Sequence, residues 1–348
     1  MRIGLLTGGG DCPGLNAAIR AVVRRARFAG HETLGIRNGW AGLSEAGQPD
    51  VIPLDRHDVS GILPEGGTIL GTSRTNPLAA EGGIEIVRDN IAALALDGLV
   101  VIGGDDTLSV AAALAGCGEP VVGIPKTMDN DVWGTERCIG FDSAATIVME
   151  AIDRLQSTAA SHHRVMVVEV MGRDAGWIAA YGGLAGGADA VLVPERPVDL
   201  DAVCRHLSQR AKVGTGSSIV VVSEGVDVPR ALGTDEVAAG ESLDAFGHPR
   251  LDRRGVGERL GREIEARTHI ETRVTVLGHL QRGGPPSLVD RVLASRYGVA
   301  AVEALEAGRW GVMVALRGEA IVEVPLDQVS RATRPVDVGL LDLAALLD

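Results

Sequence analysis

Seven short apolar runs recur along this chain, and each leads into a glycine-rich or polar motif. The runs, with the motifs that follow them, are RIGLLTGGG (2–10), GLVVIGGDD (98–106), PVVGIPK (120–126), RVMVVEVMG (164–172), AVLVPE (190–195), SSIVVVSEG (217–225) and ETRVTVLGHL (271–280). Apolar strands that alternate with helical stretches predict a mostly parallel sheet covered on both faces. Ligands bind beyond the carboxyl ends of strands in such sheets, where the motifs of this chain fall.

The length of 348 residues allows one large α/β domain or two interleaved ones. Apolar periodicity and a closing glycine predict one helix within 16–30, and a second is predicted at 256–269. Residues 233–255 are polar and lack clear periodicity, so we expect a mobile surface connection there. From Val322 onward the sequence is compatible with a helix or an extended arm.

Composition narrows the function classes. The net charge of −13 disfavours a nucleic-acid or anionic-membrane binder, and the sequence contains no run of 18 apolar residues that would cross a bilayer. Four scattered cysteines without a Cys-x-x-Cys pair favour neither a metal cage nor a disulfide framework. We read the N-terminal run as a buried strand rather than a signal peptide, and we expect a cytoplasmic protein.

The segment TGGGDCPGLNAAIR (7–20) puts three glycines between a strand and a helix. Glycine lets backbone N–H groups approach an anion, and a helix N-terminus adds a favourable dipole. Asp11 and Pro13 interrupt a dinucleotide fingerprint, and the segment lacks the Gly-Lys-Ser/Thr ending of a P-loop. A tight turn without a ligand is the alternative interpretation.

Four carboxylates follow two of the runs. In GGDDT, Asp105 is a candidate ligand for Mg²⁺, although Asp105 or Asp106 could instead cap the following helix. In PKTMDND (125–131), Asp129 and Asp131 would point the same way in an extended or turn conformation, and one of them could act as a general base. The alternative is a loop of Asx-turn residues.

Basic side chains stand at further strand and loop ends. Arginine binds phosphate bidentately. Six basic groups at such positions on an acidic chain therefore predict one pocket that binds an anion. The six are Arg74, Arg164, Arg173, Arg273, His279 and Arg282. His162 and His163 are adjacent and would face opposite ways in a strand, so we interpret them as structural.

In order and in approximate spacing, these motifs resemble the phosphofructokinase family over about residues 1–310. The segments that carry the resemblance are LTGGGDCPGLNAAIR, GGDDT, PKTMDNDV, SHHRVMVVEVMGRDAGW, SEG and RVTVLGHLQRGGPPS. The resemblance implies an α/β fold of two Rossmann-like three-layer domains with mostly parallel sheets and an active site in the cleft between them. It implies a larger domain from 1–138 plus about 255–310, a smaller one from 139–254, and a segment 311–348 of uncertain assignment.

The resemblance also implies a role for each matching residue in Mg²⁺-dependent phosphoryl transfer to a sugar 1-hydroxyl. Asp105 would bind Mg²⁺, Asp129 would be the general base, and Arg74 would lie over the transferring phosphoryl group. Gly10, Asp106 and Lys126 would face the donor, while Thr127 and Asp131 would position substrate and metal. The residues implied to hold the sugar phosphate are Arg164, Met171, Gly172, Arg173, Glu224, Arg273, His279 and Arg282.

The implied donor is pyrophosphate, because members that use ATP typically carry glycine where this chain has Asp106 and Lys126. Asp106 would occupy the place of the ATP α-phosphate, and Lys126 would attract the end of a shorter donor. The implied reaction is the reversible conversion of fructose 6-phosphate to fructose 1,6-bisphosphate in glycolysis or gluconeogenesis. The alternatives are an ATP-dependent 6-phosphofructokinase and the same chemistry on sedoheptulose 7-phosphate.

The resemblance further implies a homodimer or homotetramer in which Arg164 and Arg273 reach into the active site of a neighbouring subunit. A dinucleotide-binding oxidoreductase or a binding module without activity is the competing class. The interrupted fingerprint and the retained Asp129 and Arg74 disfavour it.

Overall fold

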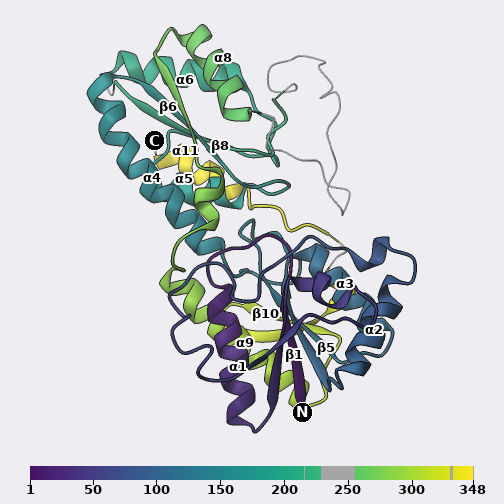
Figure 1. The fold of residues 1–348 in the computed structure, drawn as a ribbon. Coiled ribbons are helices and arrows are strands. Elements are labelled where there is room, and N and C mark those ends of the chain that lie inside the picture. Colours follow the sequence, from purple (N-terminus) through teal and green to yellow (C-terminus); the bar gives the residue numbers. More distant parts are fainter. Residues whose placement is uncertain (215, 229–254, 330–331, 348) are drawn as a thin grey trace. The chain divides into compact units, whose positions relative to one another are not determined.

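The computed structural model describes residues 1–214, 216–228, 255–329 and 332–347, and these form two compact units (Figure 1). Unit 1 contains Met1–Ser143 and the described residues of 282–333, and unit 2 contains the described residues of 144–228, 255–281 and 334–347. The mobile connection that we expected at 233–255 lies, apart from residue 255, outside the described residues.

Unit 1 is built on a seven-stranded sheet in the order β11-β10-β5-β4-β1-β2-β3. Its strands are β1 (Arg2–Thr7), β2 (Glu32–Ile36), β3 (Val51–Leu54), β4 (Gly98–Gly103), β5 (Val121–Pro125), β10 (Val312–Arg317) and β11 (Ala320–Pro325). The five inner strands are parallel, whereas the edge strands β3 and β11 are antiparallel to their neighbours. The apolar runs predicted β1, β4 and β5.

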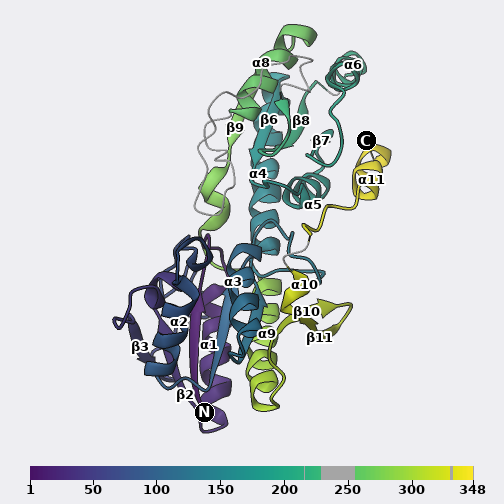
Figure 2. The ribbon, with the colours of Figure 1, turned by 90° about the vertical axis from the view of Figure 1, so that its right-hand side faces the viewer.

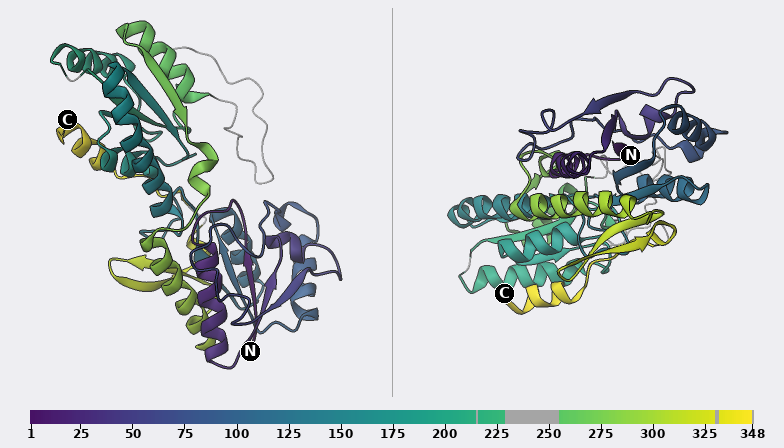
Figure 3. Two further views of the ribbon diagram at one scale, coloured as in Figure 1. Left: turned by 60° about the vertical axis from the view of Figure 1, so that its left-hand side comes forward. Right: turned by 90° about the horizontal axis from the view of Figure 1, so that it is seen from below.

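Helices cover both faces of this sheet. Its helical elements are α1 (Leu15–Phe28), η1 (Gly39–Leu43), η2 (Pro77–Ala79), α2 (Gly83–Ala93), α3 (Asp105–Gly116), α9 (Leu288–Glu306) and α10 (Leu326–Val329). α1 and α9 lie side by side on one face (Figure 3), and α2, α3 and α10 pack on the other. Alternate strand residues therefore enter two cores: Ile3 and Leu5 belong to one, and Leu6 to the other.

Unit 2 contains a parallel four-stranded sheet in the order β7-β8-β6-β9 (Figure 2). The strands are β6 (Val165–Val170), β7 (Ala190–Leu192), β8 (Ser218–Ser223) and β9 (Thr272–Val276). The helical elements are α4 (Phe141–His162), which begins in unit 1, α5 (Trp177–Gly186), α6 (Leu200–Lys212), α8 (Val256–Thr268), η3 (Gly278–Arg282), which also ends in unit 1, and α11 (Gly339–Leu347). α6 and α8 pack on one face of the sheet, and α5 packs on the other against both β7 and α4.

The structure bears on three expectations about domain organisation. Both units are three-layered α/β structures with mostly parallel sheets, as predicted. Residues 256–281, which we assigned to the larger domain, lie in unit 2 because β9 pairs with β6. The C-terminal segment is divided: β11 and α10 belong to unit 1, while α11 packs beside α5 in unit 2 (Figure 2).

No helix in the described part of the chain has both the length and the apolar character needed to cross a bilayer. All four cysteines are free.

Candidate active site

In unit 1, the sequence motifs follow three neighbouring strands. β4 lies between β1 and β5 and is parallel to both. The loops that follow these strands therefore leave the same edge of the sheet. This edge carries the glycine loop (Gly8–Gly10), the first turn of α3 with Asp105 and Asp106, and the segment 126–131.

The glycine loop is held by backbone bonds on two sides. Gly8 N–H donates to the carbonyl of Ile102 at 2.9 Å, and Gly9 N–H donates to the carbonyl of Ser73 at 3.0 Å. Thr72 Oγ1 donates to the carbonyl of Gly9 at 2.6 Å. The loop after β3 therefore contacts the glycine loop through Thr72 and Ser73. The exposed residue Arg74 directly follows Ser73 in this loop.

Thr107 explains why the two strand ends carry glycine. A Cβ atom at Gly8 would lie 2.6 Å from Thr107 Cγ2, and one at Gly103 would lie 2.3 Å from Thr107 Cβ. Neither distance is compatible with a side chain. Sequence reasoning did not identify this role of Thr107, although its place in GGDDT was the available signal.

Lys126 lies beneath the glycine loop and is buried, with 3% of its surface exposed. Its Nζ donates to the carbonyl of Gly8 at 2.9 Å and to the carbonyl of Gly10 at 2.5 Å. Burial lowers the pKa of Lys126, and the neighbouring Arg282 lowers it further. Because an ammonium group has three N–H donors, at most one is left for a ligand after these two bonds.

Asp105 and Asp106 form the first turn of α3, and both are half-buried. The N-cap position is occupied by Gly104, and no side chain caps this helix there. Neither aspartate is therefore the N-cap residue, but both stand where a helix dipole favours negative charge. Gly104 has room for a side chain, since an added Cβ atom would make only ordinary van der Waals contacts, the nearest at 3.6 Å.

The segment after Lys126 is a turn and not an extended strand. Thr127 Oγ1 accepts a hydrogen bond from Asp129 N–H at 3.1 Å. Asn130 has a left-handed conformation with φ of 54°, so Asp129 and Asp131 stand in the turn rather than in the extended conformation, of the two that we considered. Asn130 is buried, and its Oδ1 accepts the N–H of Cys138 at 2.8 Å. Asn130 therefore fixes the turn in which the two half-buried aspartates stand.

Arg282 contacts the glycine loop. Its Nη1 donates to the carbonyl of Asp11 at 2.9 Å and would lie 2.6 Å from a Cβ atom at Gly10. Gly10, Lys126 and Arg282 therefore form one group in unit 1. In this group two cationic side chains bind carbonyl oxygens of the same loop.

In unit 2, Met171, Gly172 and Arg173 follow β6 and Glu224 follows β8, at the carboxyl edge of the four-stranded sheet. The carbonyl of Gly172 accepts Ser223 Oγ at 2.6 Å and Gly225 N–H at 3.1 Å. Gly172 has φ of 134°, which a side chain would oppose. The turns after β6 and β8 are thus tied together.

Arg164 and Arg273 lie at the opposite edge of the same sheet. Arg164 precedes β6, and Arg273 is paired with Met166 near the amino end of that strand. Both contact Glu271: Arg164 Nε lies 2.7 Å from Glu271 Oε2, and Arg273 Nη2 is paired with Glu271 Oε1. These two arginines hold the pKa of Glu271 below its ordinary value.

We had expected the six basic groups to form a single pocket. Within one chain they do not, because Arg173 and Arg164 lie at opposite ends of β6. β6 has six residues, so its two ends are separated by roughly 17–20 Å. Arg173 stands beyond one end and Arg164 before the other. His279 is exposed in η3, which follows the carboxyl end of β9.

His162 and His163 are both exposed near the end of α4, and His163 has a left-handed conformation with φ of 53°. Within the residues described, no three His, Cys, Asp or Glu side chains form a group that could hold a metal ion.

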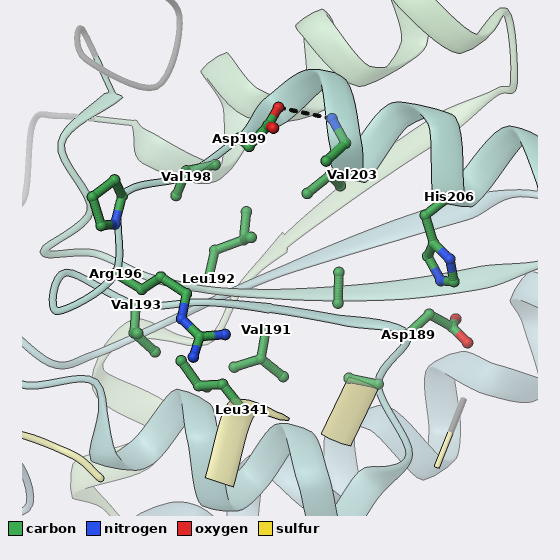
Figure 4. A pocket seen from close by; sticks show the side chains of 14 residues that line it. Asp189, Val191, Leu192, Val193, Arg196, Val198, Asp199, Val203, His206 and Leu341 are labelled. Atoms are coloured by element: carbon green, nitrogen blue, oxygen red, sulfur yellow. Dashed lines mark hydrogen bonds between the residues drawn. The ribbon is translucent and has the colours of Figure 1, made fainter. Parts of the chain in front are cut away.

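A separate pocket of about 390 Å³ lies in unit 2 between β7, α6 and α11 (Figure 4). Its walls are largely apolar, with Val191, Val203 and Leu341 among the lining side chains; the charged and imidazole side chains that line it are Asp189, Arg196, Asp199 and His206. None of the site residues that we predicted from sequence lines this pocket.

Comparison with known proteins gives consistent matches. A family model described as phosphofructokinase matches residues 2–305. The chain is 53% identical to the pyrophosphate–fructose 6-phosphate 1-phosphotransferase of Streptomyces coelicolor, over 98% of each chain. It is 48% identical to ATP-dependent 6-phosphofructokinase 3 of the same organism, over 97% of this chain and 96% of that one. Phosphofructokinase of Pichia pastoris in the T-state has a TM-score of 0.81 at 33% identity; the match covers 94% of this chain but 35% of the Pichia chain.

Proposed function

Because this chain belongs to the phosphofructokinase family, we propose that it transfers a phosphoryl group from pyrophosphate to the 1-hydroxyl of fructose 6-phosphate. The products are fructose 1,6-bisphosphate and orthophosphate. The observation that supports this donor best is the pair formed by Asp106, in the first turn of α3, and Lys126, buried beneath the glycine loop. The 53% identical relative carries the name of this activity.

The contacts of the glycine loop support a role in donor binding. The C=O and N–H of a trans peptide point in opposite directions. Since Lys126 binds the carbonyl of Gly10, the N–H of Asp11 points away from Lys126. Since Thr72 binds the carbonyl of Gly9, the N–H of Gly10 points away from Thr72. These two amides are the donors that we assign to the phosphate oxygens of pyrophosphate.

Lys126 then acts in two ways. It fixes the direction of the loop amides through its bonds to Gly8 and Gly10, and its positive charge lowers the energy of an anion bound on the loop. The charge is effective because Lys126 is buried and water screens it little. Asp106 disfavours a longer polyphosphate through its negative charge and volume.

The carboxylates fit Mg²⁺. This ion binds one or two protein carboxylates and takes its other ligands from phosphate oxygens and water, so a group of three protein ligands is not required. Asp105 is half-buried at the sheet edge beside the glycine loop and is the residue that we assign to the ion. When bound, Mg²⁺ neutralises charge on the donor phosphates.

The acceptor side of the reaction needs a base and positioning groups. Asp129 takes the proton of the sugar 1-hydroxyl, and Thr127 and Asp131 orient the substrate around it. Arg74 stabilises charge on the transferring phosphoryl group. Arg173, Met171, Gly172 and Glu224 contact the sugar, and His279 and Arg282 bind its 6-phosphate.

We infer that Arg164 and Arg273 complete the phosphate site of another subunit in a homodimer or homotetramer. Their position at the sheet edge opposite to Arg173 supports this assignment. A cytoplasmic location stays a prediction, in keeping with four free cysteines.

ATP-dependent phosphorylation of the same sugar is the second candidate, because a 48% identical relative is named for it. Sedoheptulose 7-phosphate is the alternative acceptor, since a one-carbon difference is discriminated only modestly by many sites.

Phosphorus NMR of the purified chain with Mg²⁺ and each combination of donor and acceptor tests the proposal. We expect the signals of fructose 1,6-bisphosphate and orthophosphate to grow together from pyrophosphate and fructose 6-phosphate. Consumption of pyrophosphate without a bisphosphate product would refute phosphoryl transfer to the sugar.

A further inference from the structure

Glu195 links the loop that carries Arg173 to the C-terminal segment of the chain. Glu195 Oε1 accepts the N–H of Gly176 at 3.0 Å and the N–H of Val336 at 2.8 Å, and Oε2 also lies 3.1 Å from Gly176 N. All three residues belong to unit 2. A single carboxylate therefore satisfies backbone groups from two segments that are 160 positions apart, at 176 and 336.

The neighbouring residues strengthen the same junction. Trp177 Nε1 donates to the carbonyl of Arg334 at 3.0 Å, and the Arg334 guanidinium lies 4.1 Å from the centroid of the Trp177 ring. A Cβ atom at Gly176 would lie 2.4 Å from Val193 and 3.0 Å from Glu195 Oε2, so the loop is closely packed there. The C-terminal segment is thus bound through a charged hydrogen bond and an aromatic contact.

The loop between Gly172 and Gly176 is fixed at both ends. At Gly172 the carbonyl is bound by Ser223 and Gly225, and at Gly176 the N–H is bound by Glu195. Arg173 stands one residue after the first of these anchors. Without the bond to Glu195, this end of the loop would be held by the start of α5, where the carbonyl of Gly176 accepts Ala180 N–H, and Arg173 would sample more positions.

We propose that Glu195 is a positioning residue for the sugar phosphate, which acts by fixing the Arg173 loop against the C-terminal segment 334–336. The proposal rests on the proposed function, in which Arg173 contacts the sugar. It assigns a role to residues 334–336, which lie beyond the family match that ends at residue 305. Glu195 itself need not contact the substrate.

Steady-state kinetics of Glu195→Ala and Glu195→Gln test this role. In the alanine variant we expect the KM for fructose 6-phosphate to rise at least about fivefold, while the KM for pyrophosphate changes less than about twofold. Glutamine offers a carbonyl oxygen at the position of Oε1 and should restore most of the affinity for the sugar.

Asp189→Asn is the matched control. Asp189 precedes β7, and its Oδ2 also accepts a backbone N–H in unit 2, that of Ile219 at 2.7 Å near the amino end of β8, while its Oδ1 is paired with Arg210. This variant should leave the KM for both substrates unchanged, even if it lowers the melting temperature. An unchanged ratio of the two KM values in Glu195→Ala would overturn the proposal.

Hydrogen exchange gives a second readout that needs no activity. Peptides that cover 173–177 and 334–340 should exchange faster in Glu195→Ala than in the wild type, whereas peptides that cover β8 should not change. Equal exchange rates at 173–177 would also overturn the proposal. If the wild type turns over no sugar phosphate with any donor, the proposed function fails; if the wild type is active and Glu195→Ala keeps its KM for the sugar, the inference about Glu195 fails.

Discussion

The ammonium group of Lys126 donates a hydrogen bond of 2.5 Å to the carbonyl of Gly10, across 116 positions of sequence. The same group binds the carbonyl of Gly8, so a single buried side chain holds both ends of the glycine loop. A lysine that sequence alone marks as a contact of the donor is therefore also part of the architecture of the loop.

Lys126→Met should lower kcat/KM for pyrophosphate by about 10²-fold or more, because it removes a buried charge and the bonds that direct the loop amides. It should also lower the melting temperature, since the buried bond to the carbonyl of Gly8 and the part-buried bond to the carbonyl of Gly10 are both lost. Lys212→Met, at the exposed end of α6, is the control and should change neither quantity. An active Lys126→Met enzyme with wild-type kinetics would contradict the role of this lysine.

Gly103→Ala should destabilise unit 1 by about 1–3 kcal/mol, because the added Cβ overlaps Thr107. Gly104→Ala is the adjacent control, as its Cβ would have no neighbour closer than 3.6 Å. The free energy of unfolding in urea measures both variants. Equal stability of the two would show that Thr107 moves aside at little cost.

Asp129→Asn should lower kcat by roughly 10²–10⁴-fold, the contribution of a general base, with an unchanged melting temperature.

Arg273→Ala should lose affinity for the sugar phosphate. If Arg273 serves the site of a neighbouring subunit, unfolding and refolding the two inactive variants together should restore activity. Mixed oligomers then contain sites in which both residues are intact.

The complementation experiment has a simple control, which is each variant refolded alone. Recovery to a sizeable fraction of the wild-type rate supports shared sites. No recovery in mixtures that sizing and mass analysis prove to be mixed oligomers would place Arg273 outside the active site of its neighbour.

The stability of unit 1 should depend on pH through Asp290. Burial raises the pKa of Asp290 to about 6, although its carboxylate accepts hydrogen bonds from Gly140 N–H and from the N–H and Oγ of Ser143. The folded state therefore binds this proton more tightly than the unfolded chain, where the pKa is near 3.8. The resulting stabilisation is complete below about pH 4 and is lost as the pH rises through about 6.

Asp290→Asn should remove this dependence. The free energy of unfolding of the wild type, relative to the variant, should fall by about 2 kcal/mol between pH 4 and pH 7. Urea unfolding at several pH values measures the difference. Parallel pH profiles for the two proteins would mean that Asp290 titrates normally.

Sequence reasoning could predict much of this fold because the inner strands are continuous apolar runs. β1, β4, β5, β6 and β8 were all evident in this way. β2 and β3 were not, because ETLGI and VIPL are short segments with exposed or polar positions. Residues 256–281 were assigned to the wrong unit because the pairing of β9 with β6 is a long-range contact that no local pattern reports.

The sequence motifs nominate the residues of the candidate site but do not predict their contacts. Lys126 binds main-chain carbonyls, and such partners leave no signal in the sequence. Asn130 was a missed signal: asparagine tolerates the left-handed conformation that it adopts between the two aspartates. The junction at Glu195 joins segments that are far apart in the chain, so no local sequence pattern predicts it.

The donor is the central claim, and the ratio of kcat/KM for pyrophosphate to kcat/KM for ATP tests it most directly. It should be measured on the wild-type chain with saturating fructose 6-phosphate and Mg²⁺. The presence of both Asp106 and Lys126 predicts a ratio above about 10², equivalent to roughly 2.7 kcal/mol of discrimination. A ratio below about 1, with ATP as the better donor, would contradict the account.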